Sequence, residues 1–248
     1  SYGYFLGLSS TFHYVTFFLA LLGTGLTSAG AAALNNYLER NIDLLMDRTK
    51  NRVLPSKKLS ASSGLFFGLL ASVIGFLILY LYVNNLTLFL AFITTLTYVL
   101  LYTPLKRVSW LNTFVGAVPG AILPLAGWSA ASDSLALGGW ILFFILFFWQ
   151  LPHFFALSWM YQDEYKKAGF KMLSLFDKSG KKTVQQILIH SVILWGLSVS
   201  PYFIGLAGNI YLFGAFFLGA WFIYGGLKFS RNISEDNAKR VFLISIIY

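Results

Sequence analysis

The hydropathy pattern divides the chain into long apolar runs separated by short polar segments. Seven of these runs hold the roughly 20 apolar residues that a helix needs to cross the hydrocarbon core of a membrane. We predict membrane-spanning helices near residues 11–34, 62–83, 86–104, 110–128, 136–159, 184–205 and 209–228. An eighth apolar run begins near Val241 and reaches Tyr248, which predicts a partial span. The expected fold is therefore all-α, a polytopic transmembrane helix bundle.

The composition agrees with this prediction. Hydrophobic residues make up 57% of the 248 residues, charged residues make up 11%, and the mean hydropathy is +0.70. We therefore interpret residues 1–248 as a single integral-membrane domain. The first apolar run begins close to Ser1 and lacks the charged start of a signal peptide, so we expect a chain that is truncated at both ends. The absence of cysteine excludes disulfide and thiol chemistry.

Positive charge is confined to alternate connections between the predicted spans. All 18 Lys and Arg residues lie within 40–58, 106–107, 166–182 and 228–240, whereas the other three connections carry only Asp133. The positive-inside rule predicts that the basic side faces the cytoplasm. The net charge of +9 is then explained by membrane orientation, and nucleic-acid binding is not needed.

Two acidic clusters follow the first and the fifth predicted spans, both on the basic side. Asn36, Glu39 and Asp43 would share one face if the first helix continues through them, and Asp163 and Glu164 are neighbours in the second cluster. Adjacent carboxylates repel one another unless a cation lies between them. Oxygen ligands without Cys or His favour Mg²⁺, which commonly bridges to substrate phosphates. These residues are therefore candidate metal ligands.

Basic side chains accompany the acidic clusters at Arg48, Arg52, Lys106 and Arg107. Carboxylates, a divalent cation and basic groups together can hold a diphosphate. The alternative is a solvated helix at the membrane surface whose charges form ion pairs along the helix. We favour a binding site, because two clusters end helices on the same side.

Four ordered stretches resemble one known family. The run NNYLERNIDLLMDRTKNRVLP, beginning at Asn35, is similar to the first acidic motif of the UbiA superfamily of intramembrane prenyltransferases. Its Met-x-Arg-Thr-x-x-Arg ending resembles the haem O synthase branch. YTPLKR at 102–107, NTFVGAVPGAILPLAGW at 112–128 and WQLPHFFALSWMYQDEYKKAGFKML at 149–173 agree with it. Glu39 and Glu164 depart from the pattern, since many members have Asp there, and this leaves the metal coordination open.

The resemblance implies an Mg²⁺-dependent enzyme of the bacterial cytoplasmic (inner) membrane, with its acidic motifs on the cytoplasmic side. The implied reaction transfers a farnesyl group from farnesyl diphosphate to a vinyl group of haem B (protohaem IX), giving haem O and diphosphate. A haem A synthase or an oxidase assembly factor would then receive the product. The implied catalytic and metal-binding residues are Asn36, Glu39, Asp43, Asp163 and Glu164, and the implied diphosphate-binding residues are Arg48, Arg52, Tyr102, Lys106 and Arg107.

Polar residues within the predicted spans are candidates for a haem or prenyl pocket, because polar groups are costly in a membrane unless they have a function. The candidates are Asn112, Trp149, Gln150 and His153. For His153 we leave two interpretations open, contact with the porphyrin or its iron and a helix–helix hydrogen bond. Pro119 and Pro124 predict a broken helix, and Gly116, Gly120 and Gly127 predict close approach of a neighbouring helix.

Two other functions remain open from the sequence. A membrane transporter also combines broken helices with intramembrane polar residues. However, transporter carboxylates usually lie near the middle of the bilayer, whereas these lie at helix ends beside Arg. Within the prenyltransferases, a quinone or chlorophyll prenyltransferase is the alternative to the haem enzyme.

Overall fold

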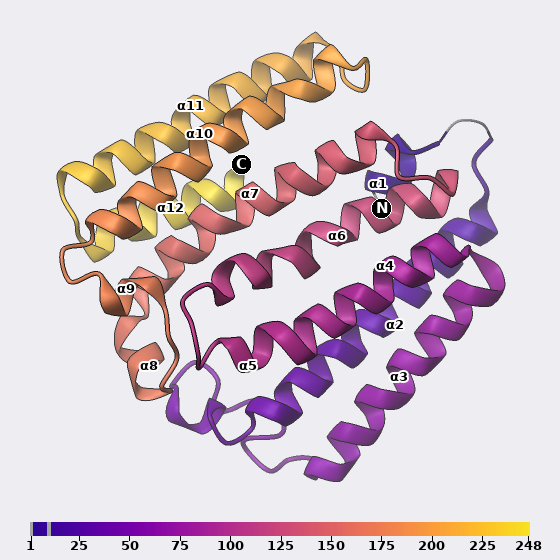
Figure 1. The fold of residues 1–248 in the computed structure, drawn as a ribbon, viewed down its shortest axis with the longest axis horizontal. Helices are drawn as coiled ribbons and strands as arrows, with labels where there is room; N and C mark the ends of the chain where they lie inside the picture. The colour runs from indigo at the N-terminus through magenta and orange to yellow at the C-terminus, as the bar shows by residue number, and fades with distance from the viewer. Residues whose placement is uncertain (1, 9–10) are drawn as a thin grey trace.

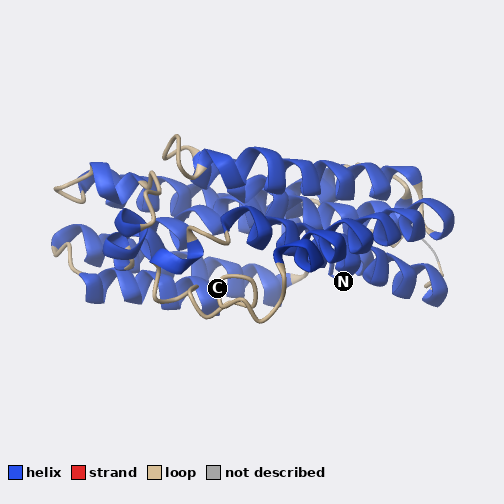
Figure 2. Ribbon diagram, turned by 90° about the horizontal axis from the view of Figure 1, so that it is seen from below, coloured by secondary structure: helices blue, strands red, loops and turns tan. Residues whose placement is uncertain are grey.

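A computed structural model describes residues 2–8 and 11–248, and the described residues form helices and connecting loops without a β-strand (Figures 1 and 2). Seven spans are long and apolar enough to cross a membrane, which confirms the predicted number. They are α2 (Tyr14–Glu39), α3 (Ala61–Tyr82), α4 (Asn85–Leu96) with its continuation through η2 (Thr97–Tyr102) and α5 (Thr103–Leu105), α6 (Asn112–Ser132), α7 (Leu137–Met160), α10 (Lys181–Phe203) and α11 (Asn209–Arg231).

The remaining elements are short: α1 (Tyr2–Leu6), η1 (Asp43–Leu45), α8 (Gln162–Lys167), α9 (Leu173–Phe176) and α12 (Glu235–Ile247). Helix α12 is the predicted partial span, but it begins six residues before Val241, at Glu235. The Ser234 hydroxyl caps it by accepting from the Asn237 N–H, and Glu235 and Asp236 favour its positive end. Hydropathy alone misses this polar first turn.

The basic connections lie together at one end of the bundle. In Figure 1 the end of α2, the turn after α5, helices α8 and α9, and the α11–α12 turn all lie toward the left. The α3–α4, α6–α7 and α10–α11 turns lie toward the opposite end. This arrangement places both predicted acidic clusters at one end, which we call the basic end.

Helices α2 and α3 pack closely through small residues. A methyl group added at Gly30 would lie 2.2 Å from the Ser72 hydroxyl, and one at Gly75 would lie 2.7 Å from the Gly23 carbonyl oxygen. Lipid gives little hydrophobic drive for helices to associate, so close van der Waals contact between small residues holds such a pair. The pair forms a wall that carries Glu39 at its basic end.

Helix α7 lies in the middle of the second half of the bundle. It packs against α6, α10 and α12, and its fully buried Leu151 and Phe155 belong to the largest apolar cluster. Helix α6 is continuous from Asn112 to Ser132 with Pro119 and Pro124 inside it, so the predicted break is wrong. Neighbouring helices stabilise a proline inside a membrane helix, which a sequence reading cannot assess.

Candidate active site

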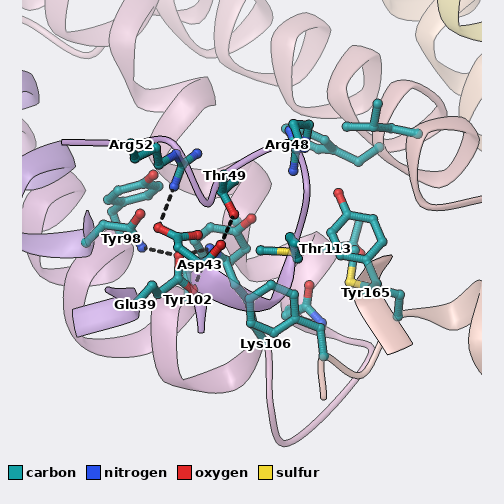
Figure 3. Close-up of a pocket in the computed structure, with 18 residues that line it drawn as sticks. Glu39, Asp43, Arg48, Thr49, Arg52, Tyr98, Tyr102, Lys106, Thr113 and Tyr165 are labelled. Carbon is teal, nitrogen blue, oxygen red and sulfur yellow. Dashed lines mark hydrogen bonds and ion pairs between the residues drawn. The ribbon is translucent and has the colours of Figure 1, made fainter. Parts of the chain in front are cut away.

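A cavity of about 190 Å³ opens at the basic end of the bundle (Figure 3). Its walls come from the ends of α2 and α5, the start of α6, the final turns of α7 and the loops that carry the acidic clusters. The lining residues are Asn35, Glu39, Asp43, Met46, Arg48, Thr49, Arg52, Tyr98, Tyr102, Lys106, Asn112, Thr113, Gly116, Phe154, Leu157, Tyr165, Phe170 and Met172. The two predicted motifs therefore contribute to one cavity.

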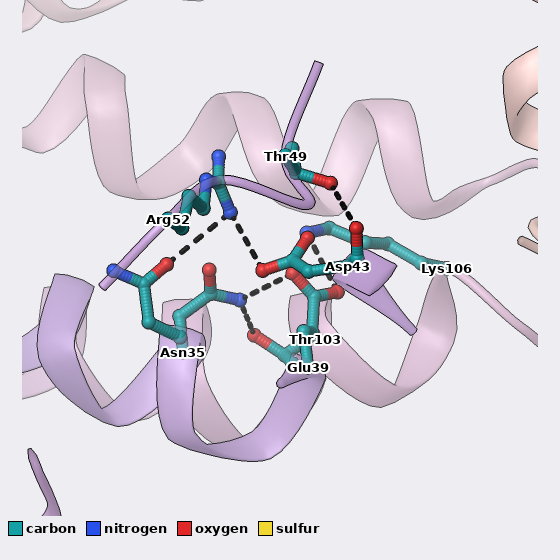
Figure 4. Close-up of polar contacts among 8 residues, drawn as sticks. Asn35, Glu39, Asp43, Thr49, Arg52, Thr103 and Lys106 are labelled. Carbon is teal, nitrogen blue, oxygen red and sulfur yellow. Dashed lines mark hydrogen bonds and ion pairs between the residues drawn. The ribbon is translucent and has the colours of Figure 1, made fainter. Parts of the chain in front are cut away.

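Glu39 is the last residue of α2 and is only 3% exposed. The Lys106 ammonium donates to both of its carboxylate oxygens, at 2.9 Å each, and the Asn35 amide donates to one of them at 3.0 Å. The same amide reaches the Thr103 hydroxyl at 2.9 Å (Figure 4). Burial of this charge contradicts the alternative of a solvated surface helix and indicates a built polar site.

Asp43 does not continue the face of α2, because that helix ends at Glu39 and Asp43 begins the 3₁₀ turn η1. The predicted helical extension is therefore wrong, although the carboxylate still faces the cavity. Arg52 donates to one Asp43 carboxylate oxygen at 3.0 Å, and the Thr49 hydroxyl donates to the Asp43 carbonyl at 2.8 Å. The other carboxylate oxygen, Oδ1, is buried without a hydrogen-bond partner.

Of the two consecutive asparagines, Asn35 lines the cavity, whereas the predicted ligand Asn36 does not. The side-chain oxygen of Asn36 instead accepts from Arg52 at 3.2 Å. Consecutive residues on a helix point about 100° apart, so only one can face inward. The spacing of four residues between Asn35 and Glu39 is the sequence signal that could have identified Asn35.

Another part of the cavity wall is a π-helical turn, η2, which interrupts the third membrane span. It brings Tyr98 and Tyr102 to the cavity, and the Thr103 hydroxyl donates to the Tyr98 carbonyl at 2.8 Å. The Lys106 ammonium lies 4.6 Å from the centre of the Tyr102 ring, since residues four positions apart share one face of a helix. Such turns are uncommon and often occur at functional sites, yet no sequence pattern revealed this one.

The glycines of α6 allow the predicted close contacts. A methyl group at Gly116 would lie 2.5 Å from the Tyr102 ring, and one at Gly120 would lie 2.2 Å from the Gln150 side-chain oxygen. At Gly127 the nearest atom is the Tyr4 nitrogen, at 3.1 Å. Gly116 therefore gives the Tyr102 ring its place in the cavity wall.

The second acidic cluster borders the cavity indirectly. Asp163 is exposed and Glu164 is half-buried, and neither lines the cavity, whereas the adjacent Tyr165 does. One Glu164 oxygen, Oε2, is buried without a partner. The backbone N–H of Lys171 donates to the Lys106 carbonyl at 2.6 Å, which ties this loop to the end of α5. The loop of the second acidic cluster is therefore held beside the cavity.

Tyr165 lies opposite Glu39 and Asp43 in Figure 3 and is 7% exposed. Burial raises the pKa of its phenol, and the nearby Arg48 opposes this only in part. The hydroxyl is therefore protonated throughout the neutral range and can donate a hydrogen bond.

The predicted basic residues differ in their placement. Arg48, Arg52 and Lys106 line the cavity, and the Arg48 guanidinium lies 5.6 Å from the centre of the Tyr161 ring. Arg107 is exposed and does not line the cavity. Three cationic groups thus surround the cavity space, which suits an anion with several charges.

Among the predicted pocket residues, only Asn112 lines the cavity. The Trp149 indole donates to the Ser245 carbonyl at 2.7 Å, and His153 Nδ1 lies 2.7 Å from the Ser245 hydroxyl. Gln150 donates to the Ala117 carbonyl at 3.1 Å. These three side chains therefore link α7 to α12 and α6, and the structure contains the helix–helix hydrogen bond that was one of the two interpretations of His153.

The cavity provides oxygen atoms suited to a hard cation. Asp43 Oδ1 and Asn112 Oδ1 in the cavity, and Glu164 Oε2 outside its lining, are buried and lack hydrogen-bond partners, which is unusual for polar atoms unless a ligand completes them. Among the described residues, no group of three or more carboxylate, His or Cys side chains converges on one point. A Mg²⁺ ion at these oxygens would therefore need water and phosphate oxygens for most of its coordination.

The family model for the UbiA prenyltransferase family matches residues 1–247, and the chain belongs to this family of prenyl-transferring enzymes. The chain is 41% identical over 255 residues to the protoheme IX farnesyltransferase of Solibacter usitatus, covering 99% of this chain and 87% of that protein. It is 43% identical over 231 residues to the protoheme IX farnesyltransferase of Sorangium cellulosum, covering 93% and 82% respectively.

Solved structures share the fold at low sequence identity. A digeranylgeranylglyceryl phosphate synthase matches with a TM-score of 0.84 and 21% identity, covering 99% of this chain and 86% of that one. A UbiA homologue from Archaeoglobus fulgidus, bound to GPP and Mg²⁺, matches with a TM-score of 0.68 and 14% identity, covering 99% and 89%. These structures confirm the predicted membrane helix bundle. The family match argues against a transporter.

Proposed function

We propose that this chain transfers a farnesyl group from farnesyl diphosphate to a vinyl group of protohaem IX. The C1–oxygen bond of the farnesyl chain breaks with its electron pair leaving on diphosphate, and C1 forms a carbon–carbon bond to the vinyl group. Water then adds its oxygen to the resulting cation and releases one proton, which gives the hydroxyl of the haem O product. The names of the two relatives support this choice of substrates. The observation that carries the proposal is the pair of buried carboxylates, Glu39 and Asp43, that line one cavity together with three cationic side chains.

The cationic side chains would stabilise the leaving group. Lys106 and Arg52 are paired with Glu39 and Asp43 in the absence of substrate, at 2.9 and 3.0 Å. A diphosphate entering the cavity offers both groups a stronger anion, so they would turn toward phosphate oxygens. Arg48 already lines the cavity without a carboxylate partner among the described residues. Charge stabilisation of this kind is most effective in a water-poor site.

Once released by Lys106 and Arg52, Glu39 and Asp43 would hold Mg²⁺, with Asp163 and Glu164 contributing from the second loop. When bound, Mg²⁺ neutralises the charge that develops on the diphosphate. The neutral Tyr165 phenol can donate to a phosphate oxygen, and its burial keeps it protonated. Any role of Asn36, Arg107, Asp163 and Glu164 would be less direct, because none of the four lines the cavity.

The apolar wall would protect the allylic cation from water. Phe154 and Leu157 of α7 line the cavity, as do Tyr98 and Tyr102. Aromatic faces stabilise a cation through their negative quadrupole, and they exclude the water that would quench it. The farnesyl chain would therefore extend from the polar loops toward these residues.

The membrane setting follows from the same proposal. The basic end would face the cytoplasm of a bacterial inner membrane, in accordance with the positive-inside rule. Water-soluble Mg²⁺ would then reach the cavity from that side, while haem and the farnesyl chain enter from the lipid. A haem A synthase or an oxidase assembly factor is the partner we propose for receiving the product.

The test is incubation of the full chain in lipid vesicles with haem B, farnesyl diphosphate and Mg²⁺, followed by mass analysis of the pigments. We expect a farnesylated, hydrated haem that requires Mg²⁺ and is absent with the Asp43→Asn variant. A parallel incubation replaces haem with 4-hydroxybenzoate as a quinone precursor. Prenylation of that acceptor without any haem product would overturn the assignment of substrate and would leave the prenyltransferase class intact.

A further inference from the structure

A groove between α11 and α12 lies apart from the cavity described above. At the basic end it holds a volume of about 530 Å³, lined by residues of both helices and their connecting turn. It adjoins a second, more apolar volume of about 300 Å³. Tyr224, Lys228 and Arg240 line both volumes, so the two parts form one continuous groove.

The end of the groove at the basic end carries a surplus of positive charge. Lys228, Arg231 and Arg240 line it, whereas Asp236 is the only carboxylate that does so. None of these four forms an ion pair with another side chain within the described part of the chain. Three cationic groups around a cavity favour an anion, and phosphate oxygens suit them well.

The other end of the groove is apolar and runs along the membrane-spanning part of both helices. Trp221, Tyr224 and Lys228 are spaced by three and four residues on α11, and Arg240, Leu243 and Ile247 are similarly spaced on α12. Each series therefore follows one helix face from a charged end to an apolar end over seven residues, a rise of about 10 Å. Leu243 and Ile247 are 47% and 61% exposed, so this face is open to lipid.

We propose that this groove binds one anionic glycerophospholipid from the leaflet at the basic end. The phosphate would lie between Lys228 and Arg240, with Arg231 nearby, and an acyl chain would follow Leu243 and Ile247. Orientation of the chain in the membrane requires positive charge at this end, but it requires neither a cavity nor an apolar continuation. A free phosphate ion would use the cationic end alone. Both the charge and the apolar continuation match a lipid.

The preference for an anionic headgroup is tested by native mass spectrometry. The full chain is released from vesicles that contain equal amounts of phosphatidylglycerol and phosphatidylcholine with identical acyl chains. We expect one retained phosphatidylglycerol. Arg240→Gln should lower its occupancy about fivefold, since one basic side chain contributes about 1 kcal/mol near an anionic surface. Lys239→Gln is the matched control, because Lys239 is exposed on the same helix but does not line the groove. Equal losses in both variants would reduce the effect to general surface charge and overturn the proposal.

The apolar part is tested with Leu243→Trp, which would fill the groove, and with Ile246→Trp as control, because Ile246 is 58% exposed and outside the groove. We expect Leu243→Trp to displace the lipid and Ile246→Trp to retain it. Inorganic phosphate, added to the wild-type chain at millimolar concentration, should not displace the lipid. Lipid retained by Leu243→Trp, or displaced by phosphate, would reduce the site to a simple anion site and overturn the proposal. Size-exclusion profiles confirm folding of each variant.

Discussion

The Lys106 ammonium contacts both carboxylate oxygens of Glu39, at 2.9 Å each, and joins the end of the third span to the end of the first. Both side chains are largely buried, with 13% and 5% of their side-chain surfaces exposed. In the absence of substrate, each group thus neutralises the other in a site where an unpaired charge would be costly. Binding of diphosphate and of Mg²⁺ should therefore be coupled. Diphosphate draws Lys106 away and frees Glu39 for Mg²⁺, and Mg²⁺ on Glu39 frees Lys106 for diphosphate.

Lys106→Gln should weaken diphosphate binding about 10- to 100-fold, since hydrogen bonds to charged groups contribute about 1.5–3 kcal/mol. Isothermal titration with diphosphate and Mg²⁺ in detergent measures the change. Arg107→Gln is the adjacent comparison, because Arg107 is exposed outside the cavity, and we expect its effect to stay below about threefold. An equal loss in both variants would show that general positive charge is responsible.

Asp43→Asn should lower turnover at least about 100-fold, because it removes the anionic oxygen that a metal would use and preserves the size of the side chain. Asp47→Asn is the matched control, since Asp47 is exposed in the same segment and its carboxylate is paired with Lys50. Steady-state rates at saturating and limiting Mg²⁺ provide the measurement. Near-normal activity of Asp43→Asn at limiting Mg²⁺ would contradict its assignment as a ligand.

Asn112→Ala should raise the Mg²⁺ concentration required for diphosphate binding about tenfold, as is typical when a metal loses a polar partner. The Asn112 amide nitrogen donates to the Ser109 and Lys171 carbonyls, at 2.7 and 2.8 Å, so its orientation is fixed and its oxygen is the atom left for a cation. Titration of diphosphate binding against Mg²⁺ checks this. Ser109→Ala, which keeps the backbone carbonyl, should leave the midpoint unchanged, and an equal shift there would indicate a disturbed loop.

His153→Phe and Ser245→Ala should each lower the free energy of unfolding by about 0.6 kcal/mol, because the two side chains share one interhelical hydrogen bond. For the same reason, the double variant should be no less stable than either single variant. Neither should change the absorption spectrum of added haem B. A spectral change in His153→Phe that is absent from Ser245→Ala would instead place the imidazole against the porphyrin.

The Tyr165 phenol has a pKa raised by burial, so the folded chain holds its proton at a pH where the unfolded chain releases it. This contribution to stability is complete below the ordinary phenol pKa, about 10, and is lost as the pH rises above it. When the pH is raised from 9 to 11, the free energy of unfolding should therefore fall less for Tyr165→Phe than for the wild type. Thermal unfolding at both pH values measures the difference. A parallel decline of both proteins would contradict the shift.

Hydropathy was enough to predict the spans because a membrane requires each one to be long and apolar, whatever its neighbours are. The ion pair between Lys106 and Glu39 could not be predicted in the same way. The two residues lie 67 positions apart, and their meeting depends on how the α2 and η2–α5 segments pack. The choice between Asn35 and Asn36 likewise depends on the rotation of α2, which the motif does not specify.

Intramembrane polar residues show a further limit of the sequence. Trp149, Gln150 and His153 had the same signal as Asn112, because each is a polar group within a predicted span. Trp149, Gln150 and His153 form hydrogen bonds with carbonyl or hydroxyl groups of neighbouring helices. Of the four residues, only Asn112 lines the cavity. Polarity inside a membrane identifies a residue with a specific contact, but the packing decides whether that contact is a ligand or another helix.

The π-helical turn at Thr97–Tyr102 determines which residues after it face the cavity. If the same residues were wound as an ordinary α-helix, everything that follows would be rotated by about 100°, because a π turn holds one residue more than an α turn. Tyr102 and Lys106 would then point away from Glu39, while the span would still be long enough to cross the bilayer. Besides carrying Tyr98 and Tyr102, the wide turn thus sets the rotation of the helix after it, so the pairing of two distant parts of the chain depends on its one additional residue.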